Sequence, residues 1–173
     1  RALRFAEENA KRNNLEETIE FRKEFFSANM LAKGSCKVIG LYPPYHPYPM
    51  SIEHLIPQHA RGGQYCQGEF KNQLTIANEF LADNGIIFFN QECPGGERWS
   101  GPEFRSYISK IVPNASVEYI EVYKPISMRA FLDQIYKPGQ QDEFVEEMSS
   151  RYETFHYNLG IIRKDRKSEI RET

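Results

Sequence analysis

The sequence predicts a single α/β domain in which helices alternate with the strands of one sheet. Its 173 residues suffice for one packed domain but not for two ordinary ones. Apolar residues make up 40% of the chain and charged residues 27%, a globular composition. Helical and strand patterns alternate along the chain, which is typical of crossover connections within a sheet.

The N-terminal part of the chain predicts one helix followed by two strands. Residues 2–13 have apolar side chains at helical spacing, and Asn13-Asn14 is a plausible stop. Residues 18–22 alternate between apolar and polar side chains and predict a strand. Residues 36–42 are mostly apolar and predict a second, buried strand.

A proline-rich segment follows this second strand. Four of the seven positions from 43 to 49 are proline, which excludes a regular helix or a central strand. The segment is therefore expected to be an extended or turning loop just beyond a strand end. Residues 51–63 are expected to be irregular.

The remainder predicts alternating elements that end in a strand. Residues 69–82 predict a helix that Asp83-Asn84-Gly85 ends, and a buried strand follows at 86–89. The later elements are a loop at 93–96, a helix at 102–111, a strand at 116–123, helices at 127–136 and 142–150, and a last strand at 155–162. We therefore predict a domain over residues 1–162 and a charged tail over residues 163–173.

Charge and cysteine content limit the possible partners and compartment. A net charge of −2 does not support broad, charge-driven binding to nucleic acid or membrane. The apolar runs are far shorter than a membrane span. Cys36, Cys66 and Cys93 form no CxxC pair, so the cysteines are expected to be reduced and the protein cytoplasmic.

Three segments together resemble class I S-adenosylmethionine-dependent methyltransferases. Residues 2–15 resemble the helix after the second strand of that family, with Asn9-Ala10 and Asn13-Asn14-Leu15 in the matching places. Residues 38–45 are similar to the fourth strand and its Asn/Asp-Pro-Pro-Tyr motif. Residues 70–89 resemble the helix and turn that lead into the fifth strand. The resemblance covers roughly residues 2–123 and is strongest for the amino-methylating branch.

This resemblance implies a fold, an activity and a set of site residues. The implied fold is a Rossmann-like sheet with helices on both faces and an antiparallel last strand. The implied activity is methyl transfer from S-adenosylmethionine to an amine on a protein or RNA. The implied catalytic residues are Tyr42, Pro43, Pro44 and Tyr45.

The resemblance also assigns residues to the cofactor and the substrate. Glu24 and Phe25 stand where the family has an acidic residue and aromatics beside the cofactor, and His46 lies near the substrate position. Glu24 is equally consistent with a charged residue on the surface, and His46 with a solvent-exposed histidine in a loop. Trp99 fits either a pocket cover or a packing residue.

The sequence departs from the family pattern in two places. Tyr42 replaces the Asn or Asp, and a phenol does not reproduce the geometry of an amide or carboxylate acceptor. The glycine-rich cofactor loop and the N-terminal strands of the family are absent, and the chain begins with Arg1. We therefore expect a truncated protein whose exposed sheet edges, including that of the strand at 18–22, favour self-association.

Two other functions are also consistent with the sequence. The first is a methyltransferase-like scaffold that binds a partner without catalysing a reaction, and the presence of Tyr42 in place of the Asn or Asp favours it. Residues 51–57 resemble the start of an HNH nuclease motif, in which His54 would activate water beside a metal and Asn72 or Asn78 would complete the site. That nuclease site requires a hairpin followed by a helix that returns to the histidine.

Overall fold

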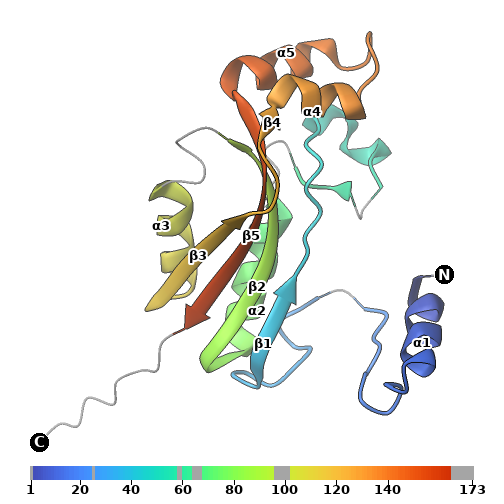
Figure 1. Cartoon of the computed structure of the whole chain (residues 1–173), viewed down its shortest axis with the longest axis vertical. Coiled ribbons are helices and arrows are strands. Elements are labelled where there is room, and N and C mark those ends of the chain that lie inside the picture. Colours follow the sequence, from blue (N-terminus) through green and yellow to red (C-terminus); the bar gives the residue numbers. More distant parts are fainter. Residues whose placement is uncertain (1, 25, 58–59, 64–67, 96–101, 165–173) are drawn as a thin grey trace, which may run out of the picture.

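The computed structural model describes residues 2–24, 26–57, 60–63, 68–95 and 102–164 (Figure 1). Predictions that concern Phe25, Cys66 and Trp99 lie outside these residues. The elements in chain order are α1 (Ala2–Arg12), β1 (Cys36–Leu41), the 3-10 helix η1 (Met50–Leu55), α2 (Gly68–Phe80), β2 (Leu81–Gly95), α3 (Pro102–Ile111), β3 (Ala115–Glu121), β4 (Ile126–Ser127), α4 (Met128–Ile135), α5 (Asp142–Arg151) and β5 (Thr154–Lys164).

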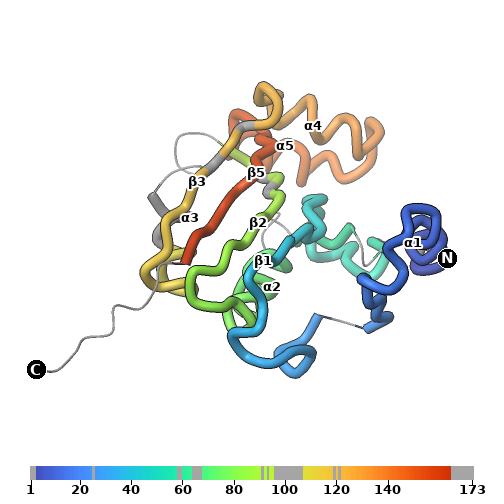
Figure 2. The backbone as a smooth tube through the Cα atoms, turned by 60° about the horizontal axis from the view of Figure 1, so that its bottom comes forward, coloured from blue at the N-terminus to red at the C-terminus, as the bar shows by residue number. Residues whose placement is uncertain are grey.

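The strands form one mixed, five-stranded sheet. Its order is β1-β2-β5-β3, and the short strand β4 pairs with the start of β5. Strand β1 runs parallel to β2, whereas β5 runs antiparallel to both β2 and β3. Figure 2 shows these four strands side by side. The predicted α/β class and the antiparallel last strand are therefore confirmed.

One face of the sheet is covered by α2 and α3. Alternate residues of a strand point to opposite faces, so Ile87 and Phe89 of β2 share a face with Ile162 of β5. These side chains form one buried core with the apolar sides of the two helices. The helical members of that core are Phe70, Leu74 and Ala77 of α2 and Ile108 of α3.

The opposite face is covered by α4 and α5 at the Thr154 end of β5 (Figure 1). Phe155 lies on this face because it is seven positions from Ile162 in an unbroken register. Its ring stacks on Phe131 of α4, with the ring centroids 3.5 Å apart. Helices α4 and α5 supply most of this second core. Helices thus lie on both faces, as predicted.

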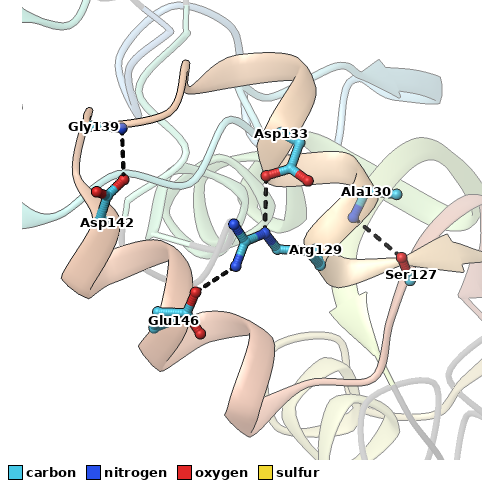
Figure 3. Close-up of polar contacts among 7 residues, drawn as sticks. All are labelled: Ser127, Arg129, Ala130, Asp133, Gly139, Asp142 and Glu146. Carbon is cyan, nitrogen blue, oxygen red and sulfur yellow. Dashed lines mark hydrogen bonds and ion pairs between the residues drawn. The ribbon is translucent and has the colours of Figure 1, made fainter.

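Polar contacts cap α4 and connect it to α5 (Figure 3). Ser127 caps α4, because its Oγ accepts a hydrogen bond of 3.1 Å from the backbone N–H of Ala130. Arg129 of α4 contacts Asp133 on its own helix and Glu146 on α5. The helix pair is therefore joined by an ion-pair bridge as well as by its apolar core.

Two predicted elements differ from the structure. Residues 18–22 do not form a strand, because the backbone N–H groups of Thr18 and Ile19 both bond to the carbonyl of Leu15 in a local turn. In the described part of the sheet the edge strands are therefore β1 and β3, and residues 18–22 form neither edge. β1 is also less buried than predicted: Leu41 is buried, but Val38 is 62% exposed because it lies on the uncovered part of the second face.

The bounds of β2 and β5 also differ from prediction. β2 begins at Leu81, directly after α2, and continues to Gly95 through residues predicted as turn and loop. Its extra length pairs with β5 as far as Thr154. β5 in turn continues through Arg163 and Lys164, two residues into the predicted tail.

Candidate active site

The corner, defined here as residues 42–49, leaves the carboxyl end of β1 and continues toward the α4–α5 pair. β2 continues beside it, since Leu41 pairs with Phe89 and β2 extends six residues further. In open α/β sheets, ligands bind beyond the carboxyl ends of parallel strands. The corner therefore occupies the edge of the sheet where this architecture places its ligands.

Two contacts from distant parts of the chain hold the corner in place. Tyr136, at the end of α4, donates a hydrogen bond of 2.9 Å from its hydroxyl to the carbonyl of Pro47. The backbone N–H of Gly62 donates to the carbonyl of His46 at 3.2 Å. A Cβ at Gly62 would lie only 2.5 Å from the carbonyl carbon of Tyr45, so glycine permits this close backbone approach.

The predicted catalytic residues differ in their exposure. Tyr42 is 70% exposed, whereas Pro43 is buried, and Pro44 and Tyr45 are half-buried. The ring of Tyr45 packs edge-on against His46, with the ring centroids 4.8 Å apart. The structure thus brings Tyr45 and His46 together and leaves Tyr42 facing solvent.

His46 lines a cleft between the corner and the helix pair. The cleft has a volume of about 490 Å³, and its lining includes Ile135, Tyr136 and Gln141. A second cavity of about 490 Å³ shares Gly139 and Gln141 with it. The lining of this second cavity includes the acidic residues Asp142, Glu143 and Glu147.

The structure also places a carboxyl group beside the corner that the sequence did not predict. Glu92 of β2 is only 6% exposed. Its Oε1 accepts a hydrogen bond of 2.8 Å from Nδ2 of Asn90, while its Oε2 is buried and has no hydrogen-bond partner among the residues that the structure describes. Burial raises the pKa of Glu92, and its interactions with Asn90 and Tyr45 partly offset that rise.

Two tyrosines lie near this carboxyl group. Tyr157 of β5 is directly opposite Glu92 in the antiparallel register, where side chains on one face are neighbours. Burial and the charge of Glu92 raise the pKa of Tyr157, and the same two causes, in the same order, raise the pKa of Tyr45 to about 12. Both phenols therefore remain protonated at neutral pH beside Glu92.

The aromatic surroundings of Glu92 extend to solvent. Tyr157 packs edge-on against Tyr123, which is 67% exposed, and against the buried Phe155. One sequence signal could have revealed Glu92. The polar run Asn90-Gln91-Glu92 directly follows a buried strand, at the sheet edge where functional side chains gather.

The structure does not bring the predicted cofactor residue to the corner. Glu24 is exposed, and its carboxylate lies 3.6 Å from the guanidinium of Arg22. Across the described ranges, no hydrogen bond or ion pair joins Glu24 to the corner. Its surroundings are those of a surface charge, and Phe25 lies outside the described residues.

The nuclease hypothesis finds no support in the described part of the chain. His54 is exposed in η1, and Asn78 uses its Nδ2 to bond the carbonyl of Ile111 on α3. β1 pairs with β2 in parallel and so does not form the required hairpin. No group of three His, Cys, Asp or Glu side chains there is arranged to hold a metal ion.

None of the helices in the described ranges combines the length and the apolar character that crossing a bilayer requires.

Comparison with known proteins finds similarity in structure alone. No family model and no curated protein matches the chain. A protein described as a sarcosine dimethylglycine methyltransferase from Galdieria sulphuraria has a TM-score of 0.51 and 11% identity, over 96% of this chain and 66% of that one. The [4+2]-cyclase SpnF has a TM-score of 0.50 and 11% identity, over 95% of this chain and 62% of that one. Geranyl diphosphate methyltransferase in complex with SAM has a TM-score of 0.50 and 10% identity, over 94% of this chain and 64% of that one.

These similarities define the fold but not the reaction. The chain spans less than two thirds of the length of each of these three structures. One of the three is named as a cyclase, so this fold carries more than one chemistry. The protein therefore has the Rossmann-like fold of S-adenosylmethionine-dependent methyltransferases.

Proposed function

We propose that this protein takes part in methyl transfer from S-adenosylmethionine to an amine on a protein or RNA, in the cytoplasm. The observation that carries the proposal is the corner at the carboxyl end of β1, with Tyr45 beside the buried carboxyl group of Glu92. The methyltransferase-like fold supports the same reaction class. The acceptor class rests on the resemblance of residues 38–45 to the amino-methylating motif.

In this proposal, the protein acts by positioning the acceptor. When bound, S-adenosylmethionine would supply a methyl group on a positively charged sulfur, and the corner would hold the amine that receives it. Carbonyl groups of the corner accept hydrogen bonds from the amine, and the ring of Tyr45 packs against the acceptor. Proline rigidifies this segment and removes competing backbone donors. The acceleration therefore comes from orientation and electrostatics, without a covalent intermediate.

The described residues fit the acceptor better than the cofactor. Near the corner, a carboxyl oxygen of Glu92 without a hydrogen-bond partner in the described ranges, together with half-buried aromatic rings, suits an N–H donor. Glu24, the described residue expected at the cofactor, is instead paired with Arg22 on the surface. We therefore assign acceptor-side roles to Pro43, Pro44, Tyr45 and His46.

A direct test combines cofactor binding with methyl transfer. The chain would be titrated with S-adenosylhomocysteine by calorimetry. It would then be incubated with methyl-labelled S-adenosylmethionine and either a lysine-containing peptide or an oligonucleotide of RNA. We expect saturable binding of S-adenosylhomocysteine and label on one acceptor, and Tyr45→Leu should weaken the labelling, because Tyr45 lies on the acceptor side. Tyr107→Leu is the matched control, since Tyr107 is also half-buried but packs with α2 and α3 on the other face.

A binding scaffold without catalysis is the second candidate. Tyr42 favours it, because this residue replaces the Asn or Asp of the resembling motif and its side chain faces solvent. If the chain neither binds S-adenosylhomocysteine nor transfers label, the methyl-transfer proposal fails and the scaffold reading remains.

We also propose that the open edge of β1 pairs with a second copy of the chain. Within the described residues β1 pairs only with β2, and Val38 is exposed beside that open edge. Unpaired edges favour strand addition, and a charged side chain opposes it. The average mass measured by light scattering should rise with protein concentration, and Val38→Lys should suppress that rise. A constant monomer mass at all concentrations would contradict this proposal.

A further inference from the structure

The inference starts from the unpaired oxygen of Glu92. Buried polar atoms in folded proteins are nearly always hydrogen-bonded, so an exception requires an explanation. Oε1 of Glu92 has its donor in Asn90, whereas Oε2 has no donor at hydrogen-bond geometry within the described residues, although the hydroxyl of Tyr45 lies near enough to interact with the carboxyl group. Leaving a buried carboxylate half-satisfied is costly, and the cost disappears when a donor binds. The position beside the corner suggests that a ligand supplies this donor.

The surroundings of Glu92 indicate the chemical class of that ligand. Tyr45 interacts with the carboxyl group from the corner, and Tyr157 lies directly opposite it in the sheet. The exposed ring of Tyr123 packs against Tyr157 and so connects this group of rings to solvent. Aromatic faces attract cations, and a buried carboxylate binds a cationic N–H donor more strongly than a neutral one. The combination suits an alkylammonium group better than the neutral amine of a nucleobase.

Charge elsewhere near the corner favours the same ligand. The cavity that adjoins the cleft is lined by Asp142, Glu143 and Glu147. These carboxylates would repel the phosphates of RNA and attract the basic residues of a peptide. The whole chain is also slightly acidic, with a net charge of −2.

We propose that Glu92 is the residue that binds the ammonium group of a lysine side chain in a basic peptide and accepts its proton. The ammonium N–H contacts Oε2, and one proton passes from nitrogen to that oxygen. This step leaves a neutral amine with its lone pair free and a neutral carboxylic acid. Burial raises the pKa of Glu92, so its carboxylate is a stronger proton acceptor than an exposed glutamate. The inference rests on the proposed function for the methyl-transfer step, but not for the binding of the peptide.

Two measurements test this inference, and the first needs no variant. The chain is titrated by calorimetry with a short basic peptide that has one central lysine, with the same peptide acetylated on that lysine, and with an oligoadenylate of RNA. We expect the lysine peptide to bind about tenfold or more tightly than its acetylated form, because acetylation removes the charge. Equal affinities for the two peptides, or preferential binding of the oligoadenylate, would overturn the inference.

The second measurement uses Glu92→Gln, which keeps the shape of the side chain and removes its charge. Glu118→Gln on β3 is the matched control, because it makes the same change in net charge at an exposed position. We expect Glu92→Gln to lower the affinity for the lysine peptide about tenfold or more and to leave binding of S-adenosylhomocysteine unchanged. Unchanged affinity in folded Glu92→Gln would overturn the inference.

The two proposals fail in different ways. Label transfer that survives Glu92→Gln would support methyl transfer and refute the role of Glu92. Conversely, lysine-specific binding that depends on Glu92, without any label transfer, would support the site and refute the methyl-transfer proposal. If Glu92→Gln does not fold, the comparison of lysine and acetyl-lysine peptides decides the matter alone.

Discussion

Gly160, in the middle of β5, provides the sharpest test of how the sheet is packed. A Cβ at this position would collide with three atoms of the Phe89 ring on the neighbouring strand. That ring is fully buried and lies 5.1 Å from the ring of Phe70, measured between centroids, so it has little room to move. Overpacking of this kind costs about 1–3 kcal/mol. In a chain of this size, that cost lowers the Tm of Gly160→Ala by about 2–12 °C.

The assay is thermal unfolding followed by circular dichroism, with two comparison variants. Gly40→Ala on β1 is the control, because nothing lies within 4 Å of its added Cβ, and we expect it to be neutral or stabilising by up to about 1 kcal/mol. Phe89→Leu removes the obstructing part of the ring, so Gly160→Ala should lower the Tm less in that background. An equal loss of Tm in both backgrounds would refute the argument that the Phe89 ring requires glycine at position 160.

Three further predictions concern the candidate site and its supports. Burial raises the pKa of Glu92 above its ordinary 4.5, so the folded state holds this proton more tightly than the unfolded state does. The resulting contribution to the free energy of unfolding is complete below pH 4.5 and is lost as pH rises through the raised pKa. Glu92→Gln should therefore raise the Tm more at pH 8 than at pH 5, and an equal change at both would contradict this reasoning. Tyr136→Phe removes the hydrogen bond to Pro47 and should cost about 1 kcal/mol in urea unfolding, with weaker peptide binding as the sign that the corner has loosened. Ser127→Ala removes the cap on Ala130 and should also cost about 1 kcal/mol, which Ser127→Asp should restore; no loss in the alanine variant would exclude a stabilising cap.

Local patterns predicted most helices and their ends. The spacing of apolar residues located α1 and α2 to within about two residues at each end, because the buried faces of helices repeat at a fixed period. Asn14 has the positive φ expected of a helix stop, and Asn114 has it after α3. These features depend on near neighbours in the chain, which is why the sequence alone was sufficient to predict them.

Features that depend on distant partners were harder to predict. The alternation at residues 18–22 resembles a strand, but the local turn at Leu15 prevails, because no strand in the described part of the chain pairs with these residues. The extension of β2 to Gly95 depends on pairing with β5, which lies some sixty residues further along the chain. Glu92 was missed for the same reason: its burial comes from the corner and from Tyr157, neither of which adjoins it in sequence.

The position of β5 has a consequence for how the protein folds. This last described element lies between β2 and β3, so the middle of the sheet stays open until β5 has been synthesised. During translation, the two flanking strands must wait with unsatisfied edges, and such edges are exposed to aggregation. Long-range pairing of this kind also slows folding, because loops must close before any contact compensates for the lost entropy. Shortening β5 should therefore impair the yield of folded protein far more than trimming α1.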